Sequence, residues 1–119
     1  MKVSIVVTHL LGTGHLARAL TLGRAYGAAG HDVQVVSGGM PAPQLKSDGV
    51  DVVQLPPLRS DGVDFARLLT DTGPARAQDF TARQDALLAA LDTHRPDVLI
   101  TELFPFGRRM LRDEFRTLL

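Results

Sequence analysis

Residues 2–8 read Lys2-Val3-Ser4-Ile5-Val6-Val7-Thr8, and Gly12-Thr13-Gly14-His15 follow closely. A compact run of β-branched residues is typical of a strand that is buried on both faces of a parallel sheet. The glycines break this strand, and a helical pattern follows over residues 15–29. Its apolar stripe comprises Leu16, Leu20, Gly23 and Gly27. A strand, a glycine-rich turn and a helix in this order predict the first half of a βαβ unit.

The same alternation continues along the chain. Further strands are expected over residues 31–37, 50–55 and 97–101, helices over 74–94 and 108–119, and a short, weak helix over 42–47. Residues 58–73 are polar and punctuated by glycine, with turn signals at 61–62 and 71–73, and no strand or helix is predicted there. The order predicts the α/β fold class, with helices on both faces of a parallel sheet whose strand order is 3-2-1-4. Four strands are few for such a sheet, so we expect residues 1–119 to be one domain of a longer, truncated protein.

The composition restricts the class of protein. Thirteen Lys and Arg balance thirteen Asp and Glu, and a neutral chain disfavours a dedicated electrostatic binder of nucleic acid. The absence of cysteine excludes disulfides, thiolate metal sites and cysteine nucleophiles, and it fits a reducing cytoplasm. No apolar run approaches the about 20 residues that a membrane span needs. We therefore expect a cytoplasmic chain without a transmembrane segment.

Two unusual loops mark the expected site. In open parallel sheets, ligands bind beyond the carboxyl ends of the strands, where the strand order reverses. With the order 3-2-1-4, this point lies between the first and the fourth strand. Residues 8–15 follow the first strand and residues 102–107 follow the fourth. The sequence therefore predicts a site between these two loops.

The glycine-rich loop is the first candidate for binding. At Gly12, Thr13 and Gly14, backbone N–H groups and a helix N-terminus favour an anion such as phosphate, although a tight turn without a ligand is an alternative. Residues 12–17 also fit a relaxed dinucleotide fingerprint. The acidic residue that should end the second strand is missing, because residues 37–39 read Ser-Gly-Gly, and this counts against NAD. An NADP-type oxidoreductase domain stays open as an alternative.

His15 and Glu102 are the candidate catalytic residues. An imidazole at a helix N-terminus suits a general base, and a carboxylate just past the fourth strand could orient it or bind a hydroxyl. His9, Phe104 and Arg108 are weaker candidates, for contacts to an acceptor. The alternatives are a loop-capping His, a surface carboxylate, a packed Phe and a solvated basic face. No metal site is expected, because His9 and His15 lack a third ligand.

A family resemblance rests on several of these segments together. Gly12-Thr13-Gly14-His15 precedes a helix that ends in Gly30-His31-Asp32-Val33. The closing stretch PDVLITELFPFGRR occupies residues 96–109, VSGG occupies 36–39 and QLPPL occupies 54–58. The chain resembles the N-terminal domain of MurG-like glycosyltransferases of family 28, and in particular a group of predicted bacterial glycosyltransferases.

The resemblance implies the N-terminal, Rossmann-like half of a two-domain GT-B fold, which handles the acceptor of a hexosyltransferase. A C-terminal half, absent from this chain, would bind most of the nucleotide-sugar donor, and no other cofactor is implied. Gly12, Thr13 and Gly14 match the family's glycine-rich loop, and His15 matches the loop histidine proposed as the base. Peripheral membrane contact is compatible with this class, the acceptor is unidentified, and the chain alone is expected to be inactive. A module that only binds a ligand or partner is the third alternative.

Overall fold

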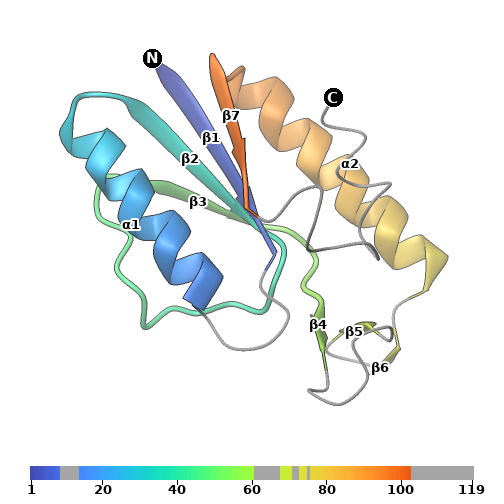
Figure 1. The fold of residues 1–119 in the computed structure, drawn as a ribbon. Helices are drawn as coiled ribbons and strands as arrows, with labels where there is room; N and C mark the ends of the chain where they lie inside the picture. The colour runs from blue at the N-terminus through green and yellow to red at the C-terminus, as the bar shows by residue number, and fades with distance from the viewer. Residues whose placement is uncertain (9–13, 61–67, 71–72, 75, 103–119) are drawn as a thin grey trace.

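The computed structural model describes residues 1–8, 14–60, 68–70, 73–74 and 76–102. Its main feature is a parallel sheet of four strands in the order β3-β2-β1-β7 (Figure 1). The strands are β1 (Lys2–Val7), β2 (Asp32–Ser37), β3 (Asp51–Gln54) and β7 (Val98–Thr101). In the register of the sheet, Ile5 lies opposite Val35 on one side and Ile100 on the other. The predicted α/β class and strand order are confirmed.

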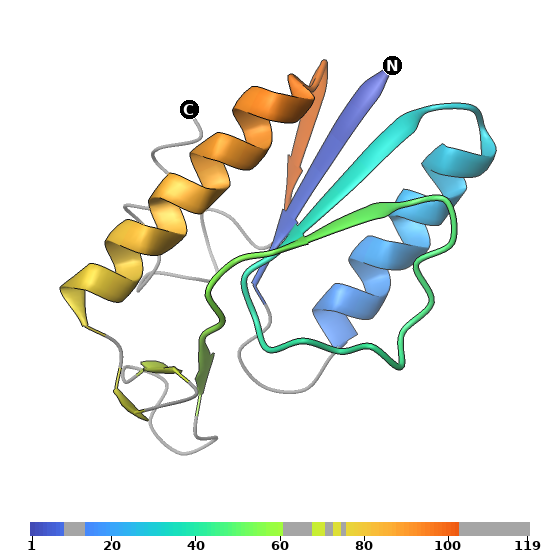
Figure 2. The ribbon, with the colours of Figure 1, turned by 180° about the vertical axis from the view of Figure 1, so that it is seen from behind.

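Two helices cover opposite faces of this sheet. α1 (Gly14–Ala28) and α2 (Ala77–His94) lie on its two sides in both views (Figures 1 and 2). Alternate residues of β1 supply the two cores, because successive side chains of a strand point to opposite faces. Val3, Ile5 and Val7 belong to the cluster that contains Leu16 and Leu20 of α1, and Val6 belongs to the cluster that contains Leu87 of α2.

A buried polar network ties α2 to the sheet. Ser4 Oγ donates to Gln34 Oε1 at 3.1 Å, and Gln34 Nε2 donates to the backbone oxygen of Ala90 at 3.4 Å. Ser4 is 0% exposed and Gln34 is 6% exposed. Buried polar groups destabilise a fold unless they are hydrogen-bonded, so these contacts let two polar residues occupy the α2 face.

Two expectations for the middle of the chain are wrong. Residues 58–73 contain three short strands, β4 (Arg59–Ser60), β5 (Leu68–Thr70) and β6 (Gly73–Pro74), in an antiparallel sheet of order β4-β5-β6. Leu58 is fully buried against the α2 face, which anchors the start of this segment. The weak helix over 42–47 does not form, since that segment contains a turn and a bend but no helical residue. Pro43 has no backbone N–H to give and disfavours the helical conformation of the residue before it.

The boundaries of the other elements differ from the prediction by up to three residues. α2 begins at Ala77 because Pro74 belongs to β6. The helix expected over residues 108–119 lies outside the described residues. Among the residues described above, neither helix combines the length and the apolar character that a membrane crossing requires.

Candidate functional site

The candidate site lies where β1 and β7 end side by side. His15 is in the first turn of α1, the helix that follows β1, and Glu102 directly follows β7. The backbone N–H of Glu102 donates to the oxygen of Val6 at 3.0 Å, which continues the β1–β7 pairing beyond the strand. The adjacency of these two strands therefore brings the two predicted catalytic residues to the same edge of the sheet.

His15 and Glu102 are in contact. The distance from His15 Nδ1 to Glu102 Oε1 is 3.1 Å, within hydrogen-bond range. The same carboxylate oxygen accepts a hydrogen bond from Arg18 NH1 at 3.0 Å. The side chains of His15 and Glu102 are 33% and 19% exposed, whereas Arg18 is 68% exposed. The carboxylate is thus the most buried member of the group, and two donors converge on one of its oxygens.

This geometry defines what the imidazole can do. An ionised carboxylate only accepts hydrogen bonds, so the contact with Glu102 places the proton of a neutral imidazole on Nδ1 of His15. Nε2 is then the nitrogen that can take up a proton. A hydrogen bond from one ring nitrogen to a carboxylate also fixes the orientation of the ring. The arrangement therefore suits a general base held in one tautomer.

Arg18 is a member of this group that the sequence analysis did not predict. It lies three residues after His15 on α1, and residues with this spacing share one face of a helix. The spacing from a candidate base was the signal that could have identified it. Since Arg18 is largely exposed, its contribution to folding is small, and its main effect is to orient the Glu102 carboxylate to which it donates.

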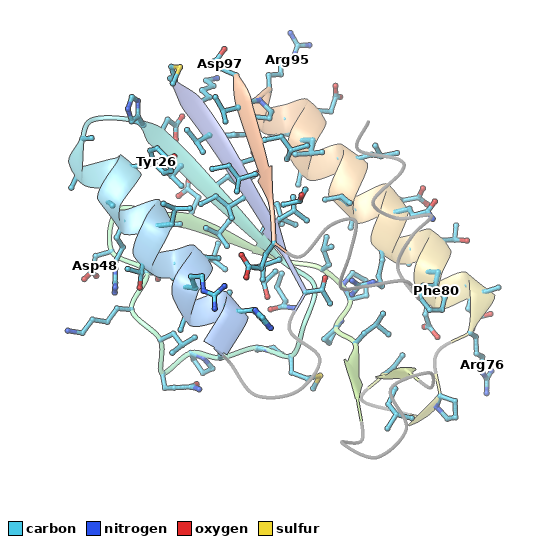
Figure 3. The ribbon with its side chains drawn as sticks, viewed as in Figure 1. Tyr26, Asp48, Arg76, Phe80, Arg95 and Asp97 are labelled. Atoms are coloured by element: carbon cyan, nitrogen blue, oxygen red, sulfur yellow. The ribbon has the colours of Figure 1, made fainter. Side chains whose placement is uncertain are left out.

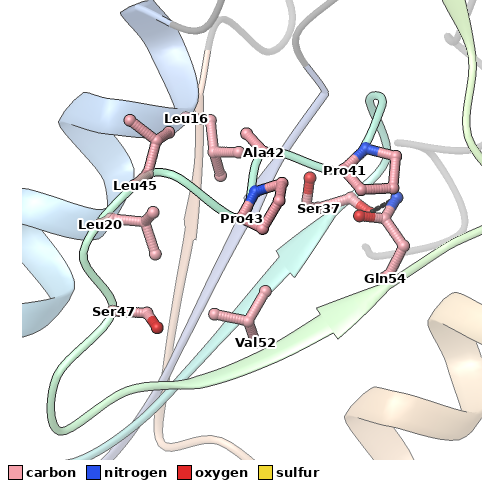
Figure 4. Close-up of a pocket in the computed structure, with 10 residues that line it drawn as sticks. All are labelled: Leu16, Leu20, Ser37, Pro41, Ala42, Pro43, Leu45, Ser47, Val52 and Gln54. Carbon is pink, nitrogen blue, oxygen red and sulfur yellow. Dashed lines mark hydrogen bonds between the residues drawn. The ribbon is translucent and has the colours of Figure 1, made fainter.

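A pocket of about 270 Å³ lies beside the first turns of α1, on the side that carries Leu16 and Leu20 (Figure 4). Its walls come from α1, from the ends of β2 and β3, and from the segment that joins those strands. The lining residues are Leu16, Leu20, Ser37, Pro41, Ala42, Pro43, Leu45, Ser47, Val52 and Gln54. Ser37 is 1% exposed, and its hydroxyl has no hydrogen-bond partner among the described residues. The pocket is mainly apolar, and it adjoins the helix turn that carries His15.

The structure describes three of the predicted site residues. Gly14 begins α1, and apart from its chain neighbours and its own helix backbone, no described residue lies within 4 Å of the place where a side chain at this position would start. His15 and Glu102 meet as described above. The other predicted positions, His9, Gly12, Thr13, Phe104 and Arg108, lie outside the described residues. No group of three or more His, Cys, Asp or Glu side chains suited to a metal ion occurs in the described part of the chain.

Comparisons with known proteins agree with this architecture. The model of the glycosyl transferase 4-like domain family matches residues 13–116. A solved structure of apo UGT2 from Phytolacca americana is similar in fold, with a TM-score of 0.55 and 19% sequence identity. That likeness covers 95% of this chain and 27% of the other, so this chain spans about a quarter of its length. No curated protein matches the chain.

The family match covers most of the chain, from the glycine-rich loop to beyond Glu102. The structural likeness supports a Rossmann-like half of the GT-B fold. Neither finding favours an oxidoreductase domain or a module that only binds a partner. The chain belongs to the glycosyl transferase 4-like domain family.

Proposed function

We propose that this chain is the acceptor-side domain of a two-domain hexosyltransferase, which transfers a sugar from a nucleotide-sugar donor to an acceptor hydroxyl. The observation that carries the proposal is the contact of His15 with Glu102 at the carboxyl edge of the sheet, in a chain of a glycosyltransferase family. The edge where β1 and β7 meet is the position at which open parallel sheets bind their ligands.

The proposed reaction begins with the acceptor hydroxyl. His15 Nε2 takes its proton, the oxygen forms a bond to the anomeric carbon of the sugar, and the nucleoside diphosphate leaves with the electron pair of the broken bond. Glu102 holds the imidazole and stabilises the imidazolium that forms. From their place in the sequence, Gly12, Thr13 and Gly14 are assigned to the diphosphate or acceptor. A second domain would bring the donor into line with the activated hydroxyl.

The finer assignments follow from the sequence motifs. The segments at residues 12–15, 30–33 and 96–109 support a relationship to the MurG-like, bacterial glycosyltransferases of family 28. His9, Phe104 and Arg108 are proposed to contact the acceptor. The proposal includes a cytoplasmic location with peripheral membrane contact, no cofactor besides the donor, and a C-terminal donor-binding domain as the main partner.

The experiment uses the full-length protein that contains this chain. It is incubated with UDP-glucose, UDP-N-acetylglucosamine and GDP-mannose in turn, and release of the nucleoside diphosphate is measured with and without alcohol acceptors. Consumption of one donor by the full-length protein, and little or none by residues 1–119 alone, supports the proposal. Tight binding of NADPH with no consumption of any donor would overturn it in favour of the oxidoreductase alternative.

A further inference from the structure

Among the described residues, Arg83 is the largest of the fully buried side chains, and it is 0% exposed. It lies on α2, and its guanidinium reaches the carboxyl edge of the sheet. NH1 donates to the backbone oxygen of Gly38 at 2.7 Å and to the backbone oxygen of Pro56. NH2 donates to Thr8 Oγ1 at 3.4 Å. One side chain from the helix layer thus binds three separate segments of the sheet layer.

These three partners share a position in the fold. Thr8 follows β1, Gly38 follows β2 and Pro56 follows β3, so each lies where the chain leaves the carboxyl edge of a strand. Gly38 is buried beyond the end of β2, where its backbone oxygen needs donors from outside the sheet, and it accepts from Arg83 NH1 and from the backbone N–H of Leu58 at 3.1 Å. The planar fork of an Arg side chain can serve several acceptors at once, which a Lys ammonium on a flexible stem does less well. Arg83 therefore cross-links the segments that follow three neighbouring strands, at their carboxyl ends.

The space around the guanidinium supports this role. A Cβ atom added to Gly38 would collide with Arg83 NH2 and with Thr8 Oγ1. Gly38 is therefore needed because Arg83 and Thr8 approach its backbone closely, and not because of an unusual backbone angle. The backbone of Gly38 is also held from its other side, because its N–H donates to the oxygen of Val7 at 2.8 Å.

We propose that Arg83 is a positioning residue for the candidate site. It fixes Thr8, where the chain leaves β1 for the segment that leads to Gly14 and His15. On the other side of β1, Glu102 is fixed through the oxygen of Val6. The contact between His15 and Glu102 therefore depends on how firmly the end of β1 is held. As a statement about sugar transfer, this inference rests on the proposed function, whereas the cross-link itself can be tested without any substrate.

The test without substrate is amide hydrogen exchange in the full-length protein carrying Arg83→Met. At the carboxyl edge, exchange at Gly38 and Glu102 is expected to rise about tenfold, because hydrogen bonds to a charged group are lost locally. At the amino edge, the amides of Asp32 and Asp97 donate to the oxygens of Met1 and Lys2 at 3.0 and 2.7 Å, and their exchange should stay unchanged.

The matched control is Arg76→Met, since Arg76 is an exposed arginine at the start of the same helix (Figure 3). The amides of Gly38 and Glu102 donate to the last two residues of β1, whereas those of Asp32 and Asp97 donate at its start, so the two groups of amides report on opposite ends of the strand. If Arg83→Met fails to fold, Arg83→Lys replaces it, and a smaller rise confined to the carboxyl edge is expected. Equal rises at both edges, or no rise at either edge, would overturn the inference.

Steady-state kinetics then connect the cross-link to the reaction. With the donor that the full-length protein consumes, Arg83→Lys should lower kcat about tenfold at a temperature where it is fully folded, with little change in the KM of the donor. If Arg83→Lys exchanges faster at the carboxyl edge but keeps its kcat, Arg83 does not position the site. Its role is then only to stabilise the fold. A wild-type protein that consumes no donor would contradict the proposed function, and the exchange result would still decide whether the cross-link exists.

Discussion

His15 Nδ1 lies 3.1 Å from Glu102 Oε1, although 87 residues separate the two positions in the sequence. The strand order brings the two residues together, because β7 pairs directly with β1 and ends beside it. The fold thus forms a histidine–carboxylate pair at the edge of the sheet where ligands bind in this class of protein. The predictions below follow from this pair and from the packing that supports it.

Replacing the carboxylate should impair transfer more than folding. In Glu102→Gln the side chain keeps its shape, but it no longer accepts with a full negative charge from His15 and Arg18. We expect turnover of the full-length protein to fall about tenfold or more, with a normal unfolding transition. Asp92→Asn is the control, because Asp92 is exposed on α2. Equal turnover in both variants would contradict the role of Glu102.

Arg18 should affect the reaction without affecting stability. Its guanidinium is 68% exposed, so Arg18→Met should change the free energy of unfolding by about 0.5 kcal/mol or less. Turnover should fall by less than in Glu102→Gln, because His15 keeps its own contact with the carboxylate. Arg24→Met on the same helix is the control, since its guanidinium contacts Thr21 and Lys46 instead. A large loss of stability in Arg18→Met would show that its structural role is greater than its exposure indicates.

The α2 face of the core offers a pair of neighbouring leucines with opposite exposure. Leu87 is 0% exposed and Leu88 is 44% exposed. Leu87→Ala should lower the free energy of unfolding by about 2–5 kcal/mol, because it leaves a cavity against Val6 and Val36. Leu88→Ala should change it by about 0.5 kcal/mol. Urea denaturation measures both, and similar losses in the two variants would be incompatible with the observed packing of α2.

Gly38 should not tolerate a side chain. In Gly38→Ala the new methyl group meets Arg83 and Thr8, so the free energy of unfolding should fall by about 1–3 kcal/mol. Gly14→Ala is the matched control, because outside its own helix and its chain neighbours no described residue lies within 4 Å of the added Cβ. Thermal or urea unfolding compares the two. A Gly38→Ala protein as stable as Gly14→Ala would mean that Arg83 does not hold its position beneath this edge.

The sheet could be predicted from the sequence because its strands are compact runs of β-branched residues separated by strong glycine and proline signals. β4, β5 and β6 escaped prediction because strands of two or three residues carry no detectable alternation. Their formation depends on contacts such as the burial of Leu58, which sequence periodicity does not show. The helical pattern over residues 42–47 is too short to outweigh the loss of a backbone donor at Pro43, inside the segment.

The site was predictable in its two main members for a related reason. The strand order places His15 and Glu102 at one edge of the sheet, since His15 is in the first turn of the helix that follows β1 and Glu102 directly follows β7. Arg18 was missed because a charged residue away from the apolar stripe is usually solvated. Arg83 was missed because an arginine on an amphipathic helix is rarely fully buried. Its burial depends on three acceptors from distant segments, a tertiary arrangement that no local pattern encodes.

The role of His15 is tested most directly by the turnover of His15→Ala in the full-length protein, measured as release of nucleoside diphosphate from the donor that the wild type consumes. The control is His31→Ala, because His31 lies at the amino end of β2, where its Nδ1 is 3.1 Å from the N-terminal nitrogen. We expect kcat to fall about 100-fold or more in His15→Ala and to stay near the wild-type value in His31→Ala. Wild-type turnover in His15→Ala would show that this imidazole is not the base.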